Sequence, residues 1–215
     1  MGDPVTGDRH ERIMAEAERI KALGEASESV APYAVNQATI GTWLDAMGYD
    51  NPRFRDGDEA PPSMAQVWTM PGLGRKRAPE DPLSRMTEFL TAQGYTAVLG
   101  TNCEQSYERY LRVGERPRVT SALDSVAGPK QTAMGEGWFV TSRNVWYVDH
   151  EDGSSEKVAE MLFRVLKFIP TRGAPPPVDP PNGEEVASLP APSVPPDQAR
   201  SARGPAGSAD AERPS

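Results

Sequence analysis

Gly48-Tyr49-Asp50-Asn51-Pro52-Arg53-Phe54 is the stretch of sequence that decides the fold of this chain. It follows residues 36–47, where apolar side chains recur at helical spacing and would form one buried face (Ile40, Trp43, Leu44 and Met47). Glycine commonly ends a helix, because it adopts the left-handed conformation without steric cost. We therefore predict a helix over residues 36–47 that ends at Gly48, followed by a polar, turn-rich overhang over residues 51–60.

One further helix is expected before this stretch and one after it. Asp8 and Glu11 resemble a capping box, which predicts an N-terminal helix over residues 8–23. Pro61-Pro62-Ser63 resembles a helix entry, because proline is tolerated in a first turn. The apolar residues 64–70 that follow it are predicted to form the buried central helix.

After one more amphipathic helix over residues 83–92, the hydrophobic period changes from that of a helix to that of a strand. Turn sequences such as Arg112-Val113-Gly114-Glu115 divide the rest of the folded chain into four strands. The strands are predicted at residues 95–111, 116–126, 136–148 and 157–169. Helices first and a long antiparallel run afterwards indicate an α+β domain.

The composition separates a folded part from a tail. Residues 170–215 hold 12 of the 22 prolines and few apolar side chains. Such a segment buries too little surface to offset its ordering entropy, so a disordered Pro/Ala/Gly-rich tail is predicted there. The expected organisation is an N-terminal helix and linker over residues 1–31, a folded domain over residues 32–169 and the tail over residues 170–215.

Charge and cysteine content narrow the class of function. The formal net charge is -8, which argues against nucleic acid as a partner. The single cysteine, Cys103, permits no intrachain disulfide. No run of 18 apolar residues occurs, so we expect no membrane span and a cytoplasmic location.

Several stretches of the chain resemble the N-terminal domain of the MaoC-like hot-dog dehydratase family. These are residues 40–48, 60–64, 102–115 and 136–143, together with the frame Gly48, Asn51 and Pro52. The resemblance implies a hot-dog fold, in which an antiparallel sheet wraps around a central helix. It also implies hydration of an enoyl thioester of coenzyme A, with the thioester as substrate and with no cofactor or metal.

The family motif Gly-Asp-x-Asn-Pro-x-His is degenerate here, because Tyr49 stands at the Asp position and Phe54 at the His position. A phenol is a poor base at neutral pH and a benzyl ring moves no proton, so no catalytic residue is expected. The chain looks most like the non-catalytic subunit of the heteromeric steroid side-chain enoyl-CoA hydratases of actinobacteria. That resemblance implies a small catalytic MaoC-like hot-dog partner that carries the Asp and His.

In that subunit the hot-dog usually continues into a zinc-ribbon and OB-fold module that docks an aldolase. The present sequence has no Cys-x-x-Cys, so the resemblance does not extend to aldolase docking.

Candidate substrate-binding residues follow from the same resemblance. Asn51 belongs to the retained frame of the motif. Pro62, Ser63 and Met64 would present the N-terminus of the central helix to a thioester carbonyl, although a simply capped core helix explains them equally. The basic run Arg75-Lys76-Arg77 would meet the phosphates of coenzyme A, or would form a solvated loop or a partner-facing patch.

Other chemically capable side chains are expected to have no catalytic role. Asp50 lies one position late in the motif and should point away from the water site. His10 and His150 are expected to be solvated, and Cys103 to be a small buried strand residue. The four tryptophans are expected in the core or in an interface (Trp43, Trp68, Trp138 and Trp146).

Two alternatives to a silent hydratase subunit stay open. The first is a non-enzymatic acyl-CoA-binding or assembly module, whose Pro-rich tail would recruit partners. The second is a thioesterase, which would need a carboxylate or a positioned water on the central helix, where residues 64–67 offer only Gln66.

Overall fold

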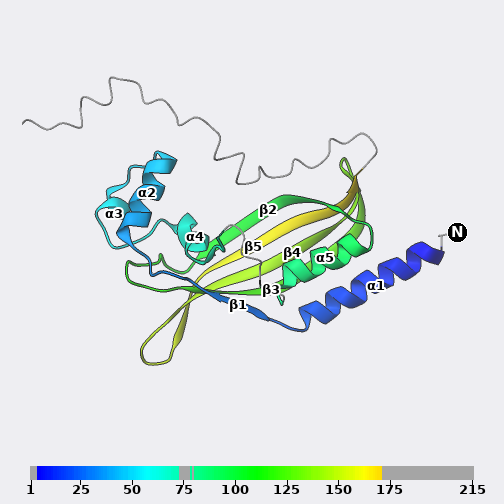
Figure 1. Ribbon diagram of the computed structural model, residues 1–215, viewed down its shortest axis with the longest axis horizontal. Helices are drawn as coiled ribbons and strands as arrows, with labels where there is room; N and C mark the ends of the chain where they lie inside the picture. The colour runs from blue at the N-terminus through cyan, green and yellow to red at the C-terminus, as the bar shows by residue number, and fades with distance from the viewer. Residues whose placement is uncertain (1–3, 73–77, 79, 171–215) are drawn as a thin grey trace, which may run out of the picture. The chain divides into compact units, whose positions relative to one another are not determined.

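The computed structural model describes residues 4–72, 78 and 80–170 of the chain (Figure 1). Its helices are α1 (Pro4–Lys21), α2 (Gln37–Met47), α3 (Pro52–Arg55), a 3-10 turn η1 (Pro62–Met64), α4 (Ala65–Thr69) and α5 (Pro82–Ala92). Its strands are β1 (Ser27–Val30), β2 (Ala97–Tyr107), β3 (Arg118–Thr132), β4 (Gly135–Asp149) and β5 (Ser155–Pro170). The predicted tail and the basic run at residues 75–77 lie outside the described residues, apart from Pro170.

The five strands form one antiparallel sheet in the order β1-β3-β4-β5-β2. The four long strands confirm the strand prediction, since each covers most of one predicted range. The linker predicted before residue 32 instead contains β1. Its sequence, Ser27-Glu28-Ser29-Val30, has little strand character of its own and is held by pairing with β3, as in Ser27 opposite Ser121.

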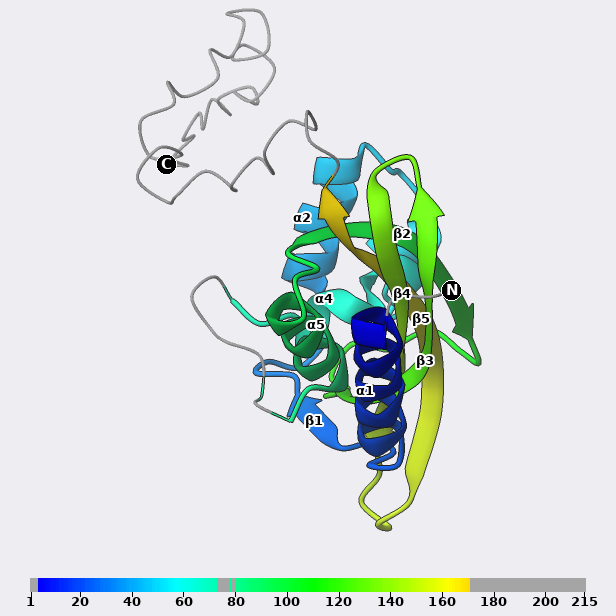
Figure 2. The same cartoon turned by 90° about the vertical axis from the view of Figure 1, so that its right-hand side faces the viewer.

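Helices α1 and α5 lie side by side on one face of the sheet (Figures 1 and 2). Helix α5 contacts β3, β4 and β5, so it is the helix that crosses the sheet. The prediction of a central helix over residues 64–70 was therefore wrong. Helix α4 has only five residues and ends where Met70 becomes extended, because the residue before a proline, here Pro71, is sterically hindered from the helical conformation.

The N-terminal helix begins earlier than the capping-box pattern indicated. Helix α1 starts at Pro4, so Asp8 lies inside it and forms an ion pair with Arg12 one turn later. Ile13, Ala17 and Ile20 face the sheet and are almost fully buried. Helix α1 is thus part of the same core as the strands.

The helix that precedes the quoted stretch is closed at both ends by local interactions. The Asn36 side chain accepts a hydrogen bond from the Thr39 backbone N–H at 2.9 Å. Gly48 has a φ of 60°, and its N–H is directed to the carbonyl groups of Leu44 and Asp45. These two caps confirm the predicted helix, with Asn36 as the cap residue and Gly48 as its end.

Gly48→Ala is expected to destabilise the fold by about 1–2 kcal/mol, because a Cβ strains the left-handed conformation. An added Cβ would meet no atom within 4 Å, so the loss would come from backbone strain alone. Gly41→Ala is the matched control: Gly41 lies inside the same helix, also in open space, and its replacement should stabilise by roughly 0.5–1 kcal/mol. Urea unfolding of the two variants measures both changes, and a loss in both would contradict the explanation.

Lys167 is a lysine whose side chain is buried in the sheet. Its ammonium group donates to the carbonyl oxygen of Thr96 at 3.2 Å, and burial lowers the pKa of the amine. The unfolded chain therefore binds more protons than the folded chain between the lowered pKa and the ordinary value of 10.5. The free energy of unfolding should consequently rise with pH across that window, while the full burial penalty acts below it.

Lys167→Met is expected to remove this pH dependence. The gain in stability of the variant over the wild type should be largest near neutral pH and should shrink as the pH approaches 10.5. Urea unfolding at pH 7, 9 and 10 tests this, with the exposed Lys130→Met as the control. A gain that stays constant across the series would show that charge burial is not its cause.

Candidate functional site

The degenerate motif lies at the turn between α2 and α3. Asn51 caps α3 by accepting a hydrogen bond from the Arg53 backbone N–H at 3.0 Å, and its amide donates to the Tyr49 hydroxyl at 3.0 Å. Phe54 is only 5% exposed, and its ring lies 6.2 Å from the ring of Tyr49 and 6.0 Å from that of Tyr110. The Phe54 side chain therefore belongs to the core.

Within the described part of the chain, the carboxylates paired with the arginines of the motif are Asp45, Asp50 and Glu59. The Asp50 carboxylate is well exposed and pairs with Arg55 at 3.0 Å, and Arg55 also pairs with Asp45 at 2.9 Å. A hollow beside Tyr110 measures only about 10 Å³, roughly the room of one water molecule. Asp50 is held as a surface ion-pair partner.

The other predicted binding residues are not brought together. Ser63 is exposed and Pro62 half-buried, whereas Met64 is completely buried. No side chain caps the 3-10 turn that they form, and the five-residue α4 follows it directly. The long central helix whose N-terminus they were expected to present is therefore absent at this point of the described chain, and Asn51 lies in the separate α2–α3 region.

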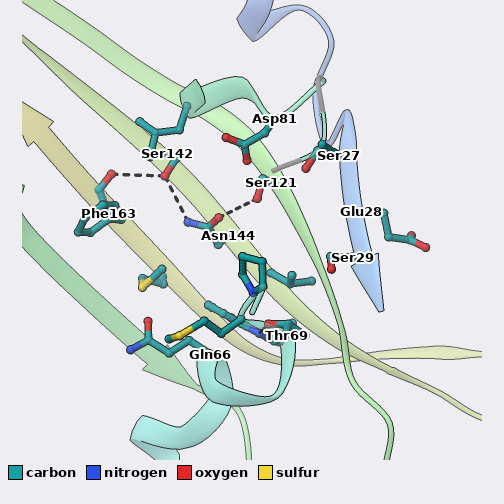
Figure 3. Close-up of a pocket in the computed structure, with 17 residues that line it drawn as sticks. Ser27, Glu28, Ser29, Gln66, Thr69, Asp81, Ser121, Ser142, Asn144 and Phe163 are labelled. Atoms are coloured by element: carbon teal, nitrogen blue, oxygen red, sulfur yellow. Dashed lines mark hydrogen bonds between the residues drawn. The ribbon is translucent and has the colours of Figure 1, made fainter. Parts of the chain in front are cut away.

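A larger cavity of about 260 Å³ lies elsewhere, between the sheet, the end of α4 and the start of α5 (Figure 3). Its lining comes from six of the described elements and their connecting loops: Ser27, Glu28, Ser29, Gln66, Thr69, Met70, Pro71, Ala78, Asp81, Leu83, Val119, Ser121, Ser142, Asn144, Trp146, Met161 and Phe163. Nine of these seventeen residues are polar or charged, so the cavity combines apolar side chains with many polar groups.

The floor of this cavity is a row of residues that crosses the sheet. Ser27 lies opposite Ser121, Ser121 opposite Asn144, and Asn144 opposite Met161. Directly opposed residues of antiparallel strands share one face, so these side chains line up toward the helices. We call Ser27, Ser121, Ser142 and Asn144 the polar floor of the cavity.

Hydrogen bonds connect the polar floor in one direction (Figure 3). The Ser121 hydroxyl donates to Asn144 Oδ1 at 2.7 Å, Asn144 Nδ2 donates to Ser142 Oγ at 3.3 Å, and the Ser142 hydroxyl donates to the Phe163 carbonyl oxygen at 3.4 Å. Ser142 is 1% exposed and Ser121 7% exposed. The network fixes the Asn144 amide with its oxygen toward Ser121 and its nitrogen toward Ser142.

The cavity forms because the polar floor separates two hydrophobic cores. One core joins α2, α3 and α4 to the sheet around Trp146 and Val148, and the other joins α1 and α5 to the sheet around Trp138 and Val140. The inward-facing positions of β4 are, in order, Trp138, Val140, Ser142, Asn144, Trp146 and Val148. Ser142 and Asn144 interrupt the apolar side chains that otherwise occupy every second position of β4. This interruption is visible in the sequence and could have been used to predict the site.

Two buried polar groups at the rim were also missed in the sequence. Asp81 is 5% exposed and caps α5 by accepting a hydrogen bond from the Ser84 backbone N–H at 2.8 Å. Thr69 accepts a hydrogen bond from the indole N–H of Trp146 at 2.9 Å, which ties the end of α4 to β4. Asp81 followed by Pro82 is a recognisable helix start, but its place at the cavity and that of Thr69 depend on packing.

Expectations for the remaining candidates had mixed outcomes. Cys103 is exposed on the edge strand β2, so the prediction of a buried cysteine was wrong. His10 and His150 are exposed, as expected. Trp68, Trp138 and Trp146 are buried in the two cores, which confirms their assignment to the core.

The described residues hold no cluster of three or more potential metal ligands. Within the same residues, no helix is long and apolar enough to cross a membrane.

The chain was compared with protein-family models, curated proteins and solved structures. No protein-family model matches the chain. A chain in the crystal structure of the ChsH1–ChsH2 complex from Mycobacterium tuberculosis is 43% identical, with a TM-score of 0.69. That match covers 75% of the present chain and 98% of the other.

Two curated proteins are also similar. The 3-oxo-4,17-pregnadiene-20-carboxyl-CoA hydratase alpha subunit of Mycobacterium tuberculosis is 45% identical over 162 residues, and the probable enoyl-CoA hydratase alpha subunit of Thermomonospora curvata is 33% identical over 165 residues. Each match covers 71% of this chain and 50% of the relative, so the chain spans about half the length of these relatives.

The antiparallel five-stranded sheet packed on helices is a hot-dog fold, and the chain belongs to the MaoC-like hot-dog family.

Proposed function

We propose that this chain is the non-catalytic subunit of a heteromeric MaoC-type enoyl-CoA hydratase. A small hot-dog partner would supply the Asp and His that activate water for addition to a 2-enoyl-CoA. The names of the relatives, which are alpha subunits of such hydratases, support this class of reaction. The proposed substrate is a coenzyme A thioester, with no further cofactor.

The observation that carries the proposal is the state of the two dyad positions. Phe54 is locked in the core against Tyr110, and Tyr49 is held as the hydrogen-bond partner of Asn51. Neither side chain can exchange a proton with water at neutral pH in the way that a carboxylate and an imidazole do. A chain that keeps the fold and loses both groups fits a subunit that shapes a site and leaves the proton transfer to its partner.

The proposed contribution of this subunit is space for the acyl group. The cavity above the polar floor offers about 260 Å³, and a neighbouring groove of about 510 Å³ shares Ser29, Thr69, Met70 and Pro71 with it. Together they reach the size range of small-molecule sites, roughly 300–1,000 Å³. A bulky acyl group, such as the steroid-derived group in the name of the relative from Mycobacterium tuberculosis, would need this room.

The binding of coenzyme A itself is part of the same proposal. Arg75, Lys76 and Arg77 would neutralise its phosphates, since guanidinium groups form forked hydrogen bonds with phosphate oxygens. Asn51 would hold the α2–α3 turn, because it caps α3, but it does not line either cavity.

Co-expression with a hot-dog protein that carries the intact Gly-Asp-x-Asn-Pro-x-His motif tests the proposal. The two chains should co-purify, and the complex should hydrate crotonyl-CoA or a steroid enoyl-CoA. Full activity of this chain alone would show that its own residues are catalytic. Absence of both a complex and activity would favour an acyl-CoA-binding or assembly module instead.

A further inference from the structure

A second hollow, also of about 260 Å³, lies on the face of the sheet that points away from α1 and α5. Trp138, Val140 and Ser142 of β4 face the helices, so the intervening Phe139 and Thr141 face the other way. This outer hollow is lined by Ser125, Ala127, Lys130, Phe139, Thr141 and Arg164. It shares no residue with the cavity above the polar floor.

Irregular pairing of β3 brings two of these side chains to the outer face. Leu123 faces the helices as part of the α1–α5 core. The pairing of β3 with β4 then shifts twice, once just before Ser125 and once just before Lys130. A shift of one residue turns the following side chains to the other face. Ser125 consequently lies opposite Thr141 and Lys130 opposite Gly137, two outward positions of β4.

Two basic side chains reach the outer hollow from opposite sides of β4. Arg164 of β5 lies opposite Thr141, and its Nε donates to the Thr141 hydroxyl oxygen at 3.0 Å. The Lys130 ammonium nitrogen lies 5.8 Å from the centre of the Phe139 ring. Phe139 and Thr141 are two residues apart on one strand, which corresponds to about 7 Å. The two cationic groups are thus anchored at neighbouring points of one surface.

These two cations have no carboxylate partner among the described residues. The carboxylates of Asp124 and Glu160, on the same face, are engaged by Arg143. Seven arginines of the described chain form ion pairs with carboxylates: Arg12, Arg19, Arg53, Arg55, Arg109, Arg118 and Arg143. In a chain of formal net charge -8, Lys130 and Arg164 converging without a carboxylate indicate a site for an anion.

Neutral groups of the outer hollow add further hydrogen-bond donors. Thr141 is 3% exposed, and its hydroxyl oxygen accepts from Arg164. Within the described chain, the hydroxyl hydrogens of Thr141 and Ser125 and the other N–H groups of Arg164 have no acceptor. A phosphate group has three terminal oxygens that accept from several donors at once, whereas a carboxylate has two. The set of donors therefore fits a phosphate group better than a carboxylate.

We propose that the outer hollow binds a phosphate group. The Arg164 guanidinium and the Lys130 ammonium group flank it, and Thr141 positions Arg164 through the hydrogen bond to its Nε. The phosphate is either the free ion or the terminal phosphate of a small ester, such as the 3′-phosphate of coenzyme A. The site is separate from the cavity assigned to the acyl group and does not depend on the proposed hydratase function.

Binding of inorganic phosphate to the full chain tests the proposal, measured by phosphorus NMR titration at constant ionic strength. Arg164→Gln should weaken binding at least about tenfold, the size expected for a lost hydrogen bond between charged groups. Lys130→Met should weaken it about fivefold. Both side chains are exposed, so both variants should fold, as checked by circular dichroism. Acetate should compete with phosphate at least about fivefold more weakly than phosphate itself.

Two controls separate the site from general effects of charge and packing. Arg112→Gln removes the same charge from an exposed arginine outside the outer hollow, and should change the affinity less than about twofold. Thr141→Val keeps the shape of the side chain and removes its hydroxyl, and should weaken binding about threefold. Thr141→Ser restores the hydroxyl and should restore the affinity, which a purely structural role of Thr141 does not predict.

Coenzyme A and 3′-dephospho-coenzyme A distinguish the two sources of phosphate. If the ester is the ligand, coenzyme A should bind at least about fivefold more tightly than its 3′-dephospho form, and Arg164→Gln should abolish this difference. If the free ion is the ligand, only inorganic phosphate should depend on Arg164. Either result supports the site. No binding of any phosphate probe, or equal losses in Arg164→Gln and Arg112→Gln, would overturn it, whether or not the complex hydrates enoyl-CoA.

Discussion

The purified chain alone is expected to hydrate crotonyl-CoA at least about 100-fold more slowly than its complex with a partner that carries the intact motif. Positioned general acids and bases typically contribute about 10²–10⁴-fold to a rate. Tyr49 and Phe54 supply neither function, and Asp50 is engaged with Arg55 at the surface. The whole of this factor should therefore depend on the partner.

Substitutions at the dyad positions refine this expectation. In the complex, Tyr49→Phe should leave the hydration rate within about twofold, because the hydroxyl is only a hydrogen-bond partner of Asn51. A tenfold or larger loss would assign a catalytic role to the Tyr49 hydroxyl.

The double change Tyr49→Asp with Phe54→His should not make the isolated chain active. A histidine at position 54 would be buried beside Tyr110, and the hollow described next to Tyr110 measures only about 10 Å³. Catalytic side chains also need supporting hydrogen bonds to hold their geometry. Clear hydration by the purified double variant would contradict this expectation and would show that the site is complete apart from its two reactive groups.

Trp138→Ala is expected to destabilise the fold by about 3–5 kcal/mol, the usual loss for truncating a large buried aromatic side chain. Trp138 is 0% exposed and lies in the cluster that joins α1 and α5 to β3, β4 and β5. Its ring is 5.3 Å from that of His10 and 6.5 Å from that of Tyr95. A Cβ added at Gly128 would come within 2.8 Å of the same ring, so the backbone is packed closely around it.

This loss is a large part of the stability of an ordinary domain, which is about 5–15 kcal/mol. Urea unfolding of the variant measures it. Trp43→Ala is the matched control, since Trp43 packs against the other cluster and stays partly exposed, and it should cost less than half as much. Similar losses for the two variants would show that the α1–α5 core is less important than its burial indicates.

The elements that could be predicted from the sequence are those whose signals are local. The helix before Gly48 has its cap, its apolar face and its terminating glycine within thirteen residues, from Asn36 to Gly48. The four long strands were recognised from local sequence, because turn sequences such as Arg112-Val113-Gly114-Glu115 separate them. The prediction that the chain lacks the catalytic dyad has the same local origin, because Tyr49 and Phe54 are identities at fixed positions in a motif.

The elements that could not be predicted depend on pairing between distant segments. Strand β1 is short and polar and exists because β3 offers it a partner. The identity of the helix that crosses the sheet was also wrong from sequence, since residues 64–70 are more apolar than α5 but are interrupted before Pro71. Apolar character alone does not predict which helical segment packs across the sheet.

By itself, the sequence determined the antiparallel strands and the helix at Gly48, and it predicted the loss of the Asp and His of the family motif. Only the tertiary structure decided where a ligand would fit. Strand register sets Ser27, Ser121 and Asn144 in one row across three strands, although they are 94 and 23 residues apart along the chain. The physical reason is that strand pairing brings together the side chains that line a cavity. The free energy of this pairing depends on the whole sheet and cannot be assigned to any one segment of the sequence.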